Sequence, residues 1–188
     1  MSNDALKNNM EFEKDYEPDV KNIIKECIAK GIDIDIDDII KDKELDSKEA
    51  TDFFIKNRNR FACRMRRINE YFDINRRQFT LRCEIHSGNA TELDKIKTGF
   101  GDFLLYGFKH EGKRKIIQWF MGDLRIFRKH NPKPIAICNN KGKDDSTLAA
   151  YNLSDLPDNF IIYSKGMPKG FHKKNIDESI DKWILKVN

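Results

Sequence analysis

The sequence predicts an α+β fold with a helical N-terminal part, a central mixed or antiparallel sheet of about five to six strands, and a C-terminal helix. Two changes of pattern along the chain predict it. Apolar residues recur at helical spacing up to residue 72, and short apolar runs separated by turn residues follow from residue 79. Helical spacing returns from residue 176. Helices, then strands, then a helix is the order typical of an α+β domain.

Charge divides the chain into two parts. Residues 1–52 carry 8 basic and 16 acidic side chains, whereas residues 53–188 carry 27 and 15, so net charges of −8 and +12 combine to the overall +4. We therefore expect an acidic N-terminal extension over residues 1–46, made of an arm and a helix, beside a basic α+β core domain over residues 47–188. A basic core attracts polyanions such as nucleic acid.

The acidic part begins with a polar segment. Residues 1–18 have no apolar period and are predicted to form a mobile or loosely docked arm. Apolar residues at helical spacing over 20–28, stopped by Gly31, predict a helix. Residues 32–37 then alternate Ile with Asp. That alternation favours a solvated edge strand or a tight turn over a divalent-cation site.

A longer helix is predicted after the candidate N-cap Ser47, with an apolar stripe of Phe54, Phe61, Met65, Ile68 and Phe72. Seven of the eleven arginines of the chain fall between residues 58 and 77. The forked guanidinium group of arginine suits phosphate, so nucleic acid or another polyanion is favoured over a solvated helix face. The predicted contacts are Arg58, Arg60, Arg64, Arg67, Arg76 and Arg77, joined by Lys113 and Arg114 of a basic hairpin loop.

Six short apolar runs predict the strands, and polar or Gly- and Pro-containing segments separate them. They are Phe79–Ile85, Phe103–Phe108, Ile116–Met121, Ile135–Cys138, Leu148–Tyr151 and Phe160–Tyr163. Few of these runs have room for a helix between them, which argues for a largely antiparallel or mixed sheet. The C-terminal helix places Ile176, Ile180, Trp183, Ile184 and Val187 on one face.

Acidic residues at the ends of predicted strands are the candidates for chemistry. Glu84 lies near the end of one strand, and Asp102 begins the next. Glu92 and Lys95 lie in the polar stretch between them. Such carboxylates can bind Mg²⁺, and a lysine can position or deprotonate a nucleophile. The candidate metal ligands are Glu84, Glu92 and Asp102, and the candidate catalytic residues are Glu84, Glu92 and Lys95.

Structural interpretations of the same residues remain open. Glu84 can pair with Arg82 or with an arginine from the 58–77 cluster, and Asp102 can belong to an ordinary turn after Gly101. The aromatic residues Tyr106 and Phe108, close to Lys109, are the better candidates for base stacking if they are exposed.

A set of short motifs runs from Glu84 through Gly88-Asn89, Thr91-Glu92, Gly101-Asp102-Phe103 and Leu105-Tyr106, and continues with Asp144-Asp145 and Leu153–Pro157. This set resembles PD-(D/E)xK-type nuclease-like proteins of phages and plasmids. The resemblance covers about residues 70–165. It implies Mg²⁺-dependent phosphodiester hydrolysis in a protein of a mobile genetic element. The chain reads Glu84-Ile85-His86 where the family has ExK, with Arg82 and Lys95 nearby. This leaves two versions, an active enzyme with migrated residues or a member that kept the fold without cleavage.

The remaining features set the expected location and partners. No run of about 18 apolar residues and no secretory signal is visible, so we expect a cytoplasmic protein without membrane contact. The four cysteines lack the spacing of a metal site, so we expect them to be reduced. The predicted partner is nucleic acid, with DNA favoured over RNA, and the acidic N-terminal segment is a second candidate contact for a protein. The alternative function is a non-catalytic binding or inhibitory protein that docks on a host protein or nucleoprotein complex.

Overall fold

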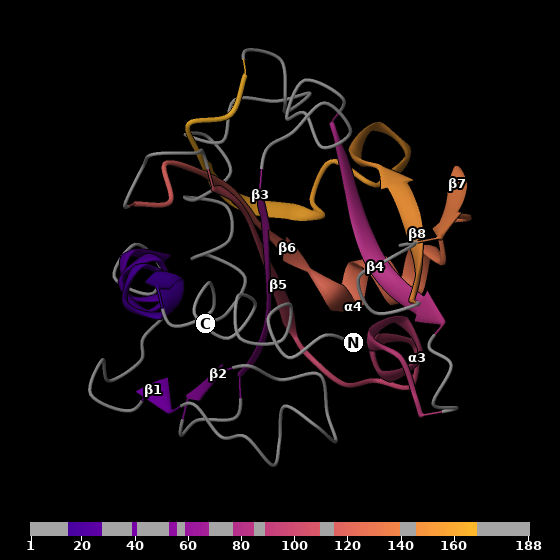
Figure 1. Cartoon of the computed structure of the whole chain (residues 1–188), viewed down its shortest axis with the longest axis horizontal. Helices are drawn as coiled ribbons and strands as arrows, with labels where there is room; N and C mark the ends of the chain where they lie inside the picture. The colour runs from indigo at the N-terminus through magenta and orange to yellow at the C-terminus, as the bar shows by residue number, and fades with distance from the viewer. Residues whose placement is uncertain are drawn as a thin grey trace.

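The computed structural model shows an α+β protein with two β-sheets (Figure 1). It describes residues 15–27, 59–66, 77–84, 89–109, 115–139 and 146–168, and the backbone alone of 39–40, 53–55 and 67. In the described part of the chain, no helix is long and apolar enough to cross a membrane.

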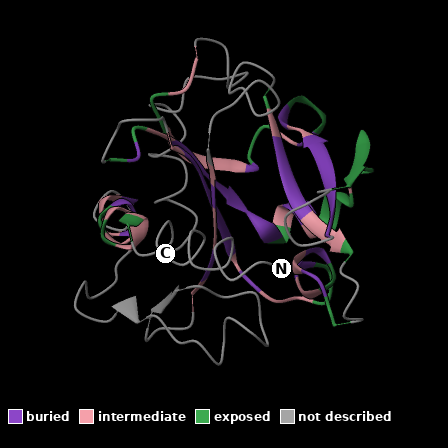
Figure 2. Cartoon of the chain, viewed as in Figure 1, coloured by how far each residue is buried: buried purple, intermediate pink, exposed green. Residues whose placement is uncertain are grey.

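The larger sheet has six strands in the order β1-β2-β3-β5-β6-β9. Strands β3 and β5 are parallel, and the other neighbouring pairs are antiparallel, so the sheet is mixed. Both faces of β5 are buried, which marks it as a central strand (Figure 2). The strands are β1 (Ile39–Ile40), β2 (Phe53–Ile55), β3 (Arg60–Arg67), β5 (Phe103–Lys109), β6 (Gln118–Asp123) and β9 (Ile161–Lys165).

The smaller sheet has three antiparallel strands in the order β4-β8-β7. They are β4 (Gln78–Glu84), β8 (Thr147–Asn152) and β7 (Ala136–Asn139). Two short helices stand beside the sheets, α3 (Glu92–Lys97) and α4 (Leu124–His130), and a single 3₁₀ turn, η3 (Leu153–Asp155), follows β8. Sequence patterns did not predict either α3 or α4. Both have local cap signals, because Thr91 and Asp94 form a capping box and Asp123 caps α4.

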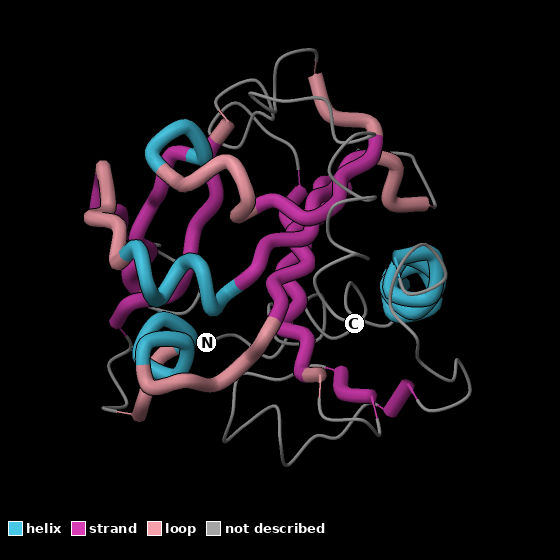
Figure 3. Tube along the Cα trace, turned by 180° about the vertical axis from the view of Figure 1, so that it is seen from behind, coloured by secondary structure: helices cyan, strands magenta, loops and turns pink. Residues whose placement is uncertain are grey.

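Two apolar cores lie on opposite faces of the larger sheet. On one face, Phe61, Met65 and Leu105 pack with the helix over residues 15–27. On the other face, Tyr106 and Phe120 pack with the smaller sheet through Phe79. Figure 3, seen from behind, shows the helix over 15–27 on one side of the larger sheet and the smaller sheet on the other. This arrangement follows from the period-two alternation of strand residues between faces.

The predictions for the N-terminal part need one correction. The helix over 20–28 is confirmed up to residue 27, but it already includes residues 15–18, which were expected in a mobile arm. The helix belongs to the packed core, since Val20 and Ile24 are fully buried against the larger sheet. Asp19 also links the helix to the segment before β6, because its carboxylate accepts a hydrogen bond from the backbone N–H of Ile116 at 2.9 Å. The boundary expected at residue 46 stays a prediction.

All six strand predictions after residue 79 are confirmed within a few residues, as β4 to β9. One central sheet was expected to hold them, and this is wrong: they divide between two sheets. Short apolar runs indicate strands, but they do not show which run pairs with which, because pairing is decided by contacts distant in sequence.

The long helix predicted after Ser47 is wrong, because Phe53–Ile55 and Arg60–Arg67 are strands. Residues four apart lie on one face of both a helix and a strand, so Phe61 and Met65 fit either structure. The deciding signal is the alternation around them. Cys63 shares their face, whereas Ala62 packs into the opposite core.

Several predictions lie outside the described residues. They concern the segment 32–37, the C-terminal helix over 176–187, and four of the predicted nucleic-acid contacts, namely Arg58, Arg76, Lys113 and Arg114.

Candidate functional site

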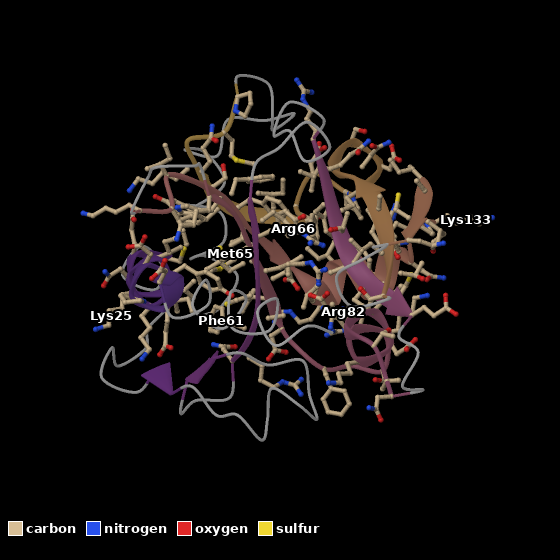
Figure 4. All side chains as sticks on the ribbon, viewed as in Figure 1. Lys25, Phe61, Met65, Arg66, Arg82 and Lys133 are labelled. Carbon is tan, nitrogen blue, oxygen red and sulfur yellow. The ribbon has the colours of Figure 1, made fainter. Side chains whose placement is uncertain are left out.

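Three arginines from two different strands gather between the larger and the smaller sheet. Strand alternation directs Arg64 and Arg66 of β3 away from Phe61 and Met65, which face the helix over 15–27. Arg82 comes from β4. Figure 4 shows Arg66 and Arg82 on one side of β3 and Phe61 and Met65 on the other. We call Arg64, Arg66 and Arg82 the arginine cluster.

Glu92, the first residue of α3, joins this cluster to the helix. Its carboxylate forms an ion pair with the guanidinium group of Arg64, and the same Oε2 atom accepts a hydrogen bond from the backbone N–H of Arg82 at 3.0 Å. The side chains of Arg64 and Glu92 are 14% and 17% exposed. The interaction is therefore shielded from water, where a charge-assisted hydrogen bond is stronger than at the surface.

The capping box of α3 determines where Glu92 lies. Thr91 Oγ1 accepts a hydrogen bond from the Asp94 N–H at 3.2 Å, and Asp94 Oδ2 accepts one from the Thr91 N–H at 3.0 Å. This reciprocal pair begins the helix at Glu92, whose carboxylate lies in the first turn, where the helix dipole favours negative charge.

Arg66 joins the arginine cluster to the smaller sheet. It donates a hydrogen bond to Thr80 Oγ1 at 2.6 Å, and Thr80 in turn lies 3.3 Å from the Tyr106 hydroxyl. Burial, and then the neighbouring charge of Arg64, lower the pKa of Arg66 from its usual value, against the opposing effect of Tyr106 and Glu92. Burial is therefore the main effect that lowers the pKa of Arg66.

The Nε atoms of Arg64, Arg66 and Arg82 are all buried. For Arg64, no hydrogen-bond acceptor for Nε lies among the described residues. A buried donor without an acceptor costs free energy, and an anionic ligand is one way to satisfy it. The cluster and Glu92 together carry three positive charges and one negative charge.

Arg60, at the start of β3, has a different environment. Its backbone N–H and its Nε donate to Asp102 Oδ2 at 2.9 and 3.3 Å, and another guanidinium nitrogen donates to the Gly99 carbonyl at 2.9 Å. The Asp102 N–H donates to the Arg60 carbonyl at 2.8 Å. This set of bonds ties the beginning of β3 to the beginning of β5, so Arg60 and Asp102 hold the parallel pair together.

The structure does not bring the three candidate metal ligands together. Glu92 is paired with Arg64, Asp102 with Arg60, and Glu84 is exposed at the end of β4, where it accepts a hydrogen bond from Thr147 Oγ1 at 3.1 Å. In the described ranges, no group of three or more His, Cys, Asp or Glu side chains could hold a metal ion. The candidate catalytic Lys95 lies in the last turn of α3 and is partly exposed. No family model and no curated protein matches this chain. The resemblance to PD-(D/E)xK-type nuclease-like proteins and the Mg²⁺ site therefore stay predictions.

The remaining predicted contacts have mixed outcomes. Arg77 is exposed just before β4, with a φ of 51°. Arg67 is the last residue of β3, and its side chain lies outside the described residues. Tyr106 and Phe108 do not meet the condition for base stacking, since they are 1% and 3% exposed and belong to the core. Both lie on β5, which is covered on both faces.

Sequence reasoning missed Arg82, Thr80 and Tyr106 as members of one polar network. The available signal was the alternation of Thr80 and Arg82 with the apolar Phe79 and Leu81 along β4. It places the polar pair on one face, but it does not show that this face meets the arginines of β3.

Proposed function

We propose that this protein binds nucleic acid and that the arginine cluster contacts its phosphate backbone. One observation carries the proposal: Arg64, Arg66 and Arg82 converge from two strands on a shielded region where Glu92 supplies one carboxylate. Arginine binds phosphate oxygens through two parallel hydrogen bonds, and these bonds strengthen where water is partly excluded.

Burial limits what such a site can recognise. The Arg64 side chain is 14% exposed, and the neighbouring aromatic residues Tyr106 and Phe108 are in the core. Stacking of bases on these aromatics is therefore excluded, whereas a phosphate oxygen is small enough to approach the guanidinium edges. Binding through phosphate alone is insensitive to base sequence and weakens steeply with salt. DNA remains favoured over RNA as a prediction from the sequence.

Fluorescence anisotropy with labelled DNA and RNA, single- and double-stranded, at several salt concentrations tests the proposal. Arg82→Gln and Arg66→Gln should each weaken binding and reduce the log–log salt slope by about one. For Arg64 the suitable variant is the double substitution Arg64→Gln with Glu92→Gln, because it removes both partners of the ion pair and leaves no buried charge alone. Lys25→Gln, on the outer side of the helix over 15–27, is the control and should leave binding unchanged (Figure 4).

Thermal unfolding of each variant separates lost binding from lost folding. If folded Arg66 and Arg82 variants keep the affinity and the salt slope of the wild type, the cluster is a structural network and the proposal is wrong.

Cleavage of the bound nucleic acid is the second function to test. Among the candidate metal ligands, Glu84 is the one that supports cleavage, because its carboxylate is exposed and contacts Thr147 instead of an arginine. Incubation of labelled DNA and RNA with Mg²⁺ or with EDTA should show Mg²⁺-dependent products that Glu84→Ala abolishes. Binding without products under every condition would favour the non-catalytic alternative, a binding or inhibitory protein that docks on a host protein or nucleoprotein complex.

A further inference from the structure

Strand β7 is an exposed edge of the smaller sheet. In the order β4-β8-β7 it is the last strand, and within the described part of the chain it pairs with β8 alone. All four of its residues, Ala136–Asn139, are exposed, and Figure 2 shows the strand in the colour of exposed residues. Edge strands present backbone N–H and C=O groups that a further strand can pair with.

Exposed apolar side chains concentrate at this edge. Ile137 and Ile135 are 58% and 44% exposed, and the described residues hold one other large apolar side chain of this kind, Ile117 at 46%. Ile137 pairs with Ala149 of β8, which is fully buried on the core face. Paired residues of antiparallel strands share a face, so the layer that covers the core face at β8 stops before β7. Apolar side chains of an added strand would continue that layer over Ile137.

The surroundings of β7 carry positive charge at its beginning. Lys129 lies in the last turn of α4, and Lys133 lies in the five-residue connection between α4 and the strand; both are exposed. Lys133 projects at the periphery of the molecule in Figure 4. Two acidic residues also lie near this strand: Asp155, whose backbone carbonyl contacts His130, and Glu84, which shares Thr147 with Asn139 at the end of β7. The charge pattern therefore fits an acidic partner whose carboxylates lie next to Lys129 and Lys133.

Prolines limit the length of the pairing. Pro132 and Pro134 precede β7 and have no backbone N–H, and the Ile135 N–H already donates to the Ala150 carbonyl at 2.8 Å, so an added strand can pair only with the short stretch Ala136–Asn139. This favours a short extended segment over a long sheet-to-sheet contact between two domains.

We propose that the outer edge of β7 binds a short, extended, acidic segment of a partner protein, which adds to the smaller sheet as a fourth strand with its apolar side chains over Ile135 and Ile137. The proposal is independent of nucleic-acid binding, because it uses neither the arginine cluster nor Glu92.

The test uses the full chain and a fluorescein-labelled ten-residue peptide in which isoleucine and aspartate alternate, with binding followed by fluorescence anisotropy. The same peptide with isoleucine and lysine alternating tests the charge, and a version N-methylated at alternate residues tests the backbone pairing. We expect the acidic peptide to bind and the lysine peptide and the N-methylated peptide to bind at least about tenfold more weakly.

Protein variants locate the site. Ile137→Glu should weaken binding of the acidic peptide by about tenfold or more, and Lys133→Glu should weaken it while strengthening binding of the lysine peptide. Ile117→Glu is the matched control, because it makes the same change at a similarly exposed isoleucine away from β7, and it should leave binding unchanged.

Three results would overturn the proposal. They are absence of acidic-peptide binding at millimolar concentration, equal binding of the N-methylated and unmodified peptides, and equal loss in the Ile117→Glu and Ile137→Glu variants. The comparison of the N-methylated and unmodified peptides uses the unaltered protein, so it tests the proposal even if a protein variant folds poorly.

Discussion

Arg64 of β3 and Glu92 of α3 form an ion pair although 28 residues separate them in the sequence. The pair links a central region of the larger sheet to the helix that precedes β5, and Glu92 also accepts the backbone N–H of Arg82 in the smaller sheet. One carboxylate therefore connects three elements around the arginine cluster.

Substitution of Glu92 tests this connection. Glu92→Ala leaves the largely buried Arg64 guanidinium group and the Arg82 N–H without this acceptor, so we expect a loss of about 2–3 kcal/mol in the free energy of unfolding, measured with urea. The control is Glu26→Ala, because Glu26 pairs with Lys165 at the surface, where the side chains are 34% and 57% exposed. We therefore expect Glu26→Ala to lower the free energy of unfolding by less than about 1 kcal/mol. Equal losses of unfolding free energy in the two variants would show that Glu92 stabilises the fold no more than a surface ion pair does.

The capping box of α3 gives a second prediction. Thr91→Ala removes the side-chain oxygen that accepts the Asp94 N–H, and it should lower the free energy of unfolding by about 1 kcal/mol. Hydrogen bonds from the backbone and then the side chain of Thr91 lower the pKa of Asp94 below its usual value of 3.8. The stabilisation by Asp94 is therefore present above about pH 4 and is lost as the pH falls through the lowered pKa.

Unfolding measurements between about pH 5 and pH 2 check the sign of this effect. The Asp94→Asn variant should lose less stability on acidification than the wild type. Asp158→Asn, in an exposed turn, should behave like the wild type. A steeper acid loss in Asp94→Asn would contradict the assignment.

Gly122 in β6 has no room for a side chain. A Cβ atom there would lie 2.5 Å from Cζ of Phe160, which is buried among Phe79, Phe120 and Phe127. Gly122→Ala should therefore cost about 1–3 kcal/mol of unfolding free energy. Gly107→Ala is the comparison, because its nearest neighbour is the flexible end of Met65 and can move aside. The Gly122 variant should be the less stable of the two by urea unfolding.

Tyr151 gives a prediction at alkaline pH. Burial, and then the charge of Cys83, raise the pKa of Tyr151 to about 12 from 10.0. Tyr151 ionises at lower pH in the unfolded chain than in the folded protein. Its contribution to the free energy of unfolding is therefore complete below about pH 10. It is lost between pH 10 and about 12, by up to about 1.4 kcal/mol per pH unit. An ultraviolet titration should show a late tyrosine step that Tyr151→Phe removes. A titration of Tyr151 near pH 10 in the folded protein would contradict the prediction.

Local patterns predicted much of the secondary structure but not the position of the arginines. Each strand from β4 to β9 matches an apolar run between turn residues, because strand formation depends on near neighbours and on what each face buries. The helix prediction for the segment around Phe61 and Met65 was wrong, because a four-residue spacing suits both a helix and a strand. There the alternation of Arg64 and Arg66 with their apolar neighbours was the informative feature.

The sequence by itself determined the mixed α+β class, the amphipathic helix that reaches residue 27, the strands after residue 79 and the positive charge of the part that contains them. Only the tertiary structure decided that these strands form two sheets, that Arg64 meets Glu92 and Arg60 meets Asp102, and that β7 stays at an exposed edge. The physical reason is the range of the interactions. Helical and strand periods arise between residues a few positions apart, whereas ion pairs and sheet order depend on which distant segments the two apolar cores bring together.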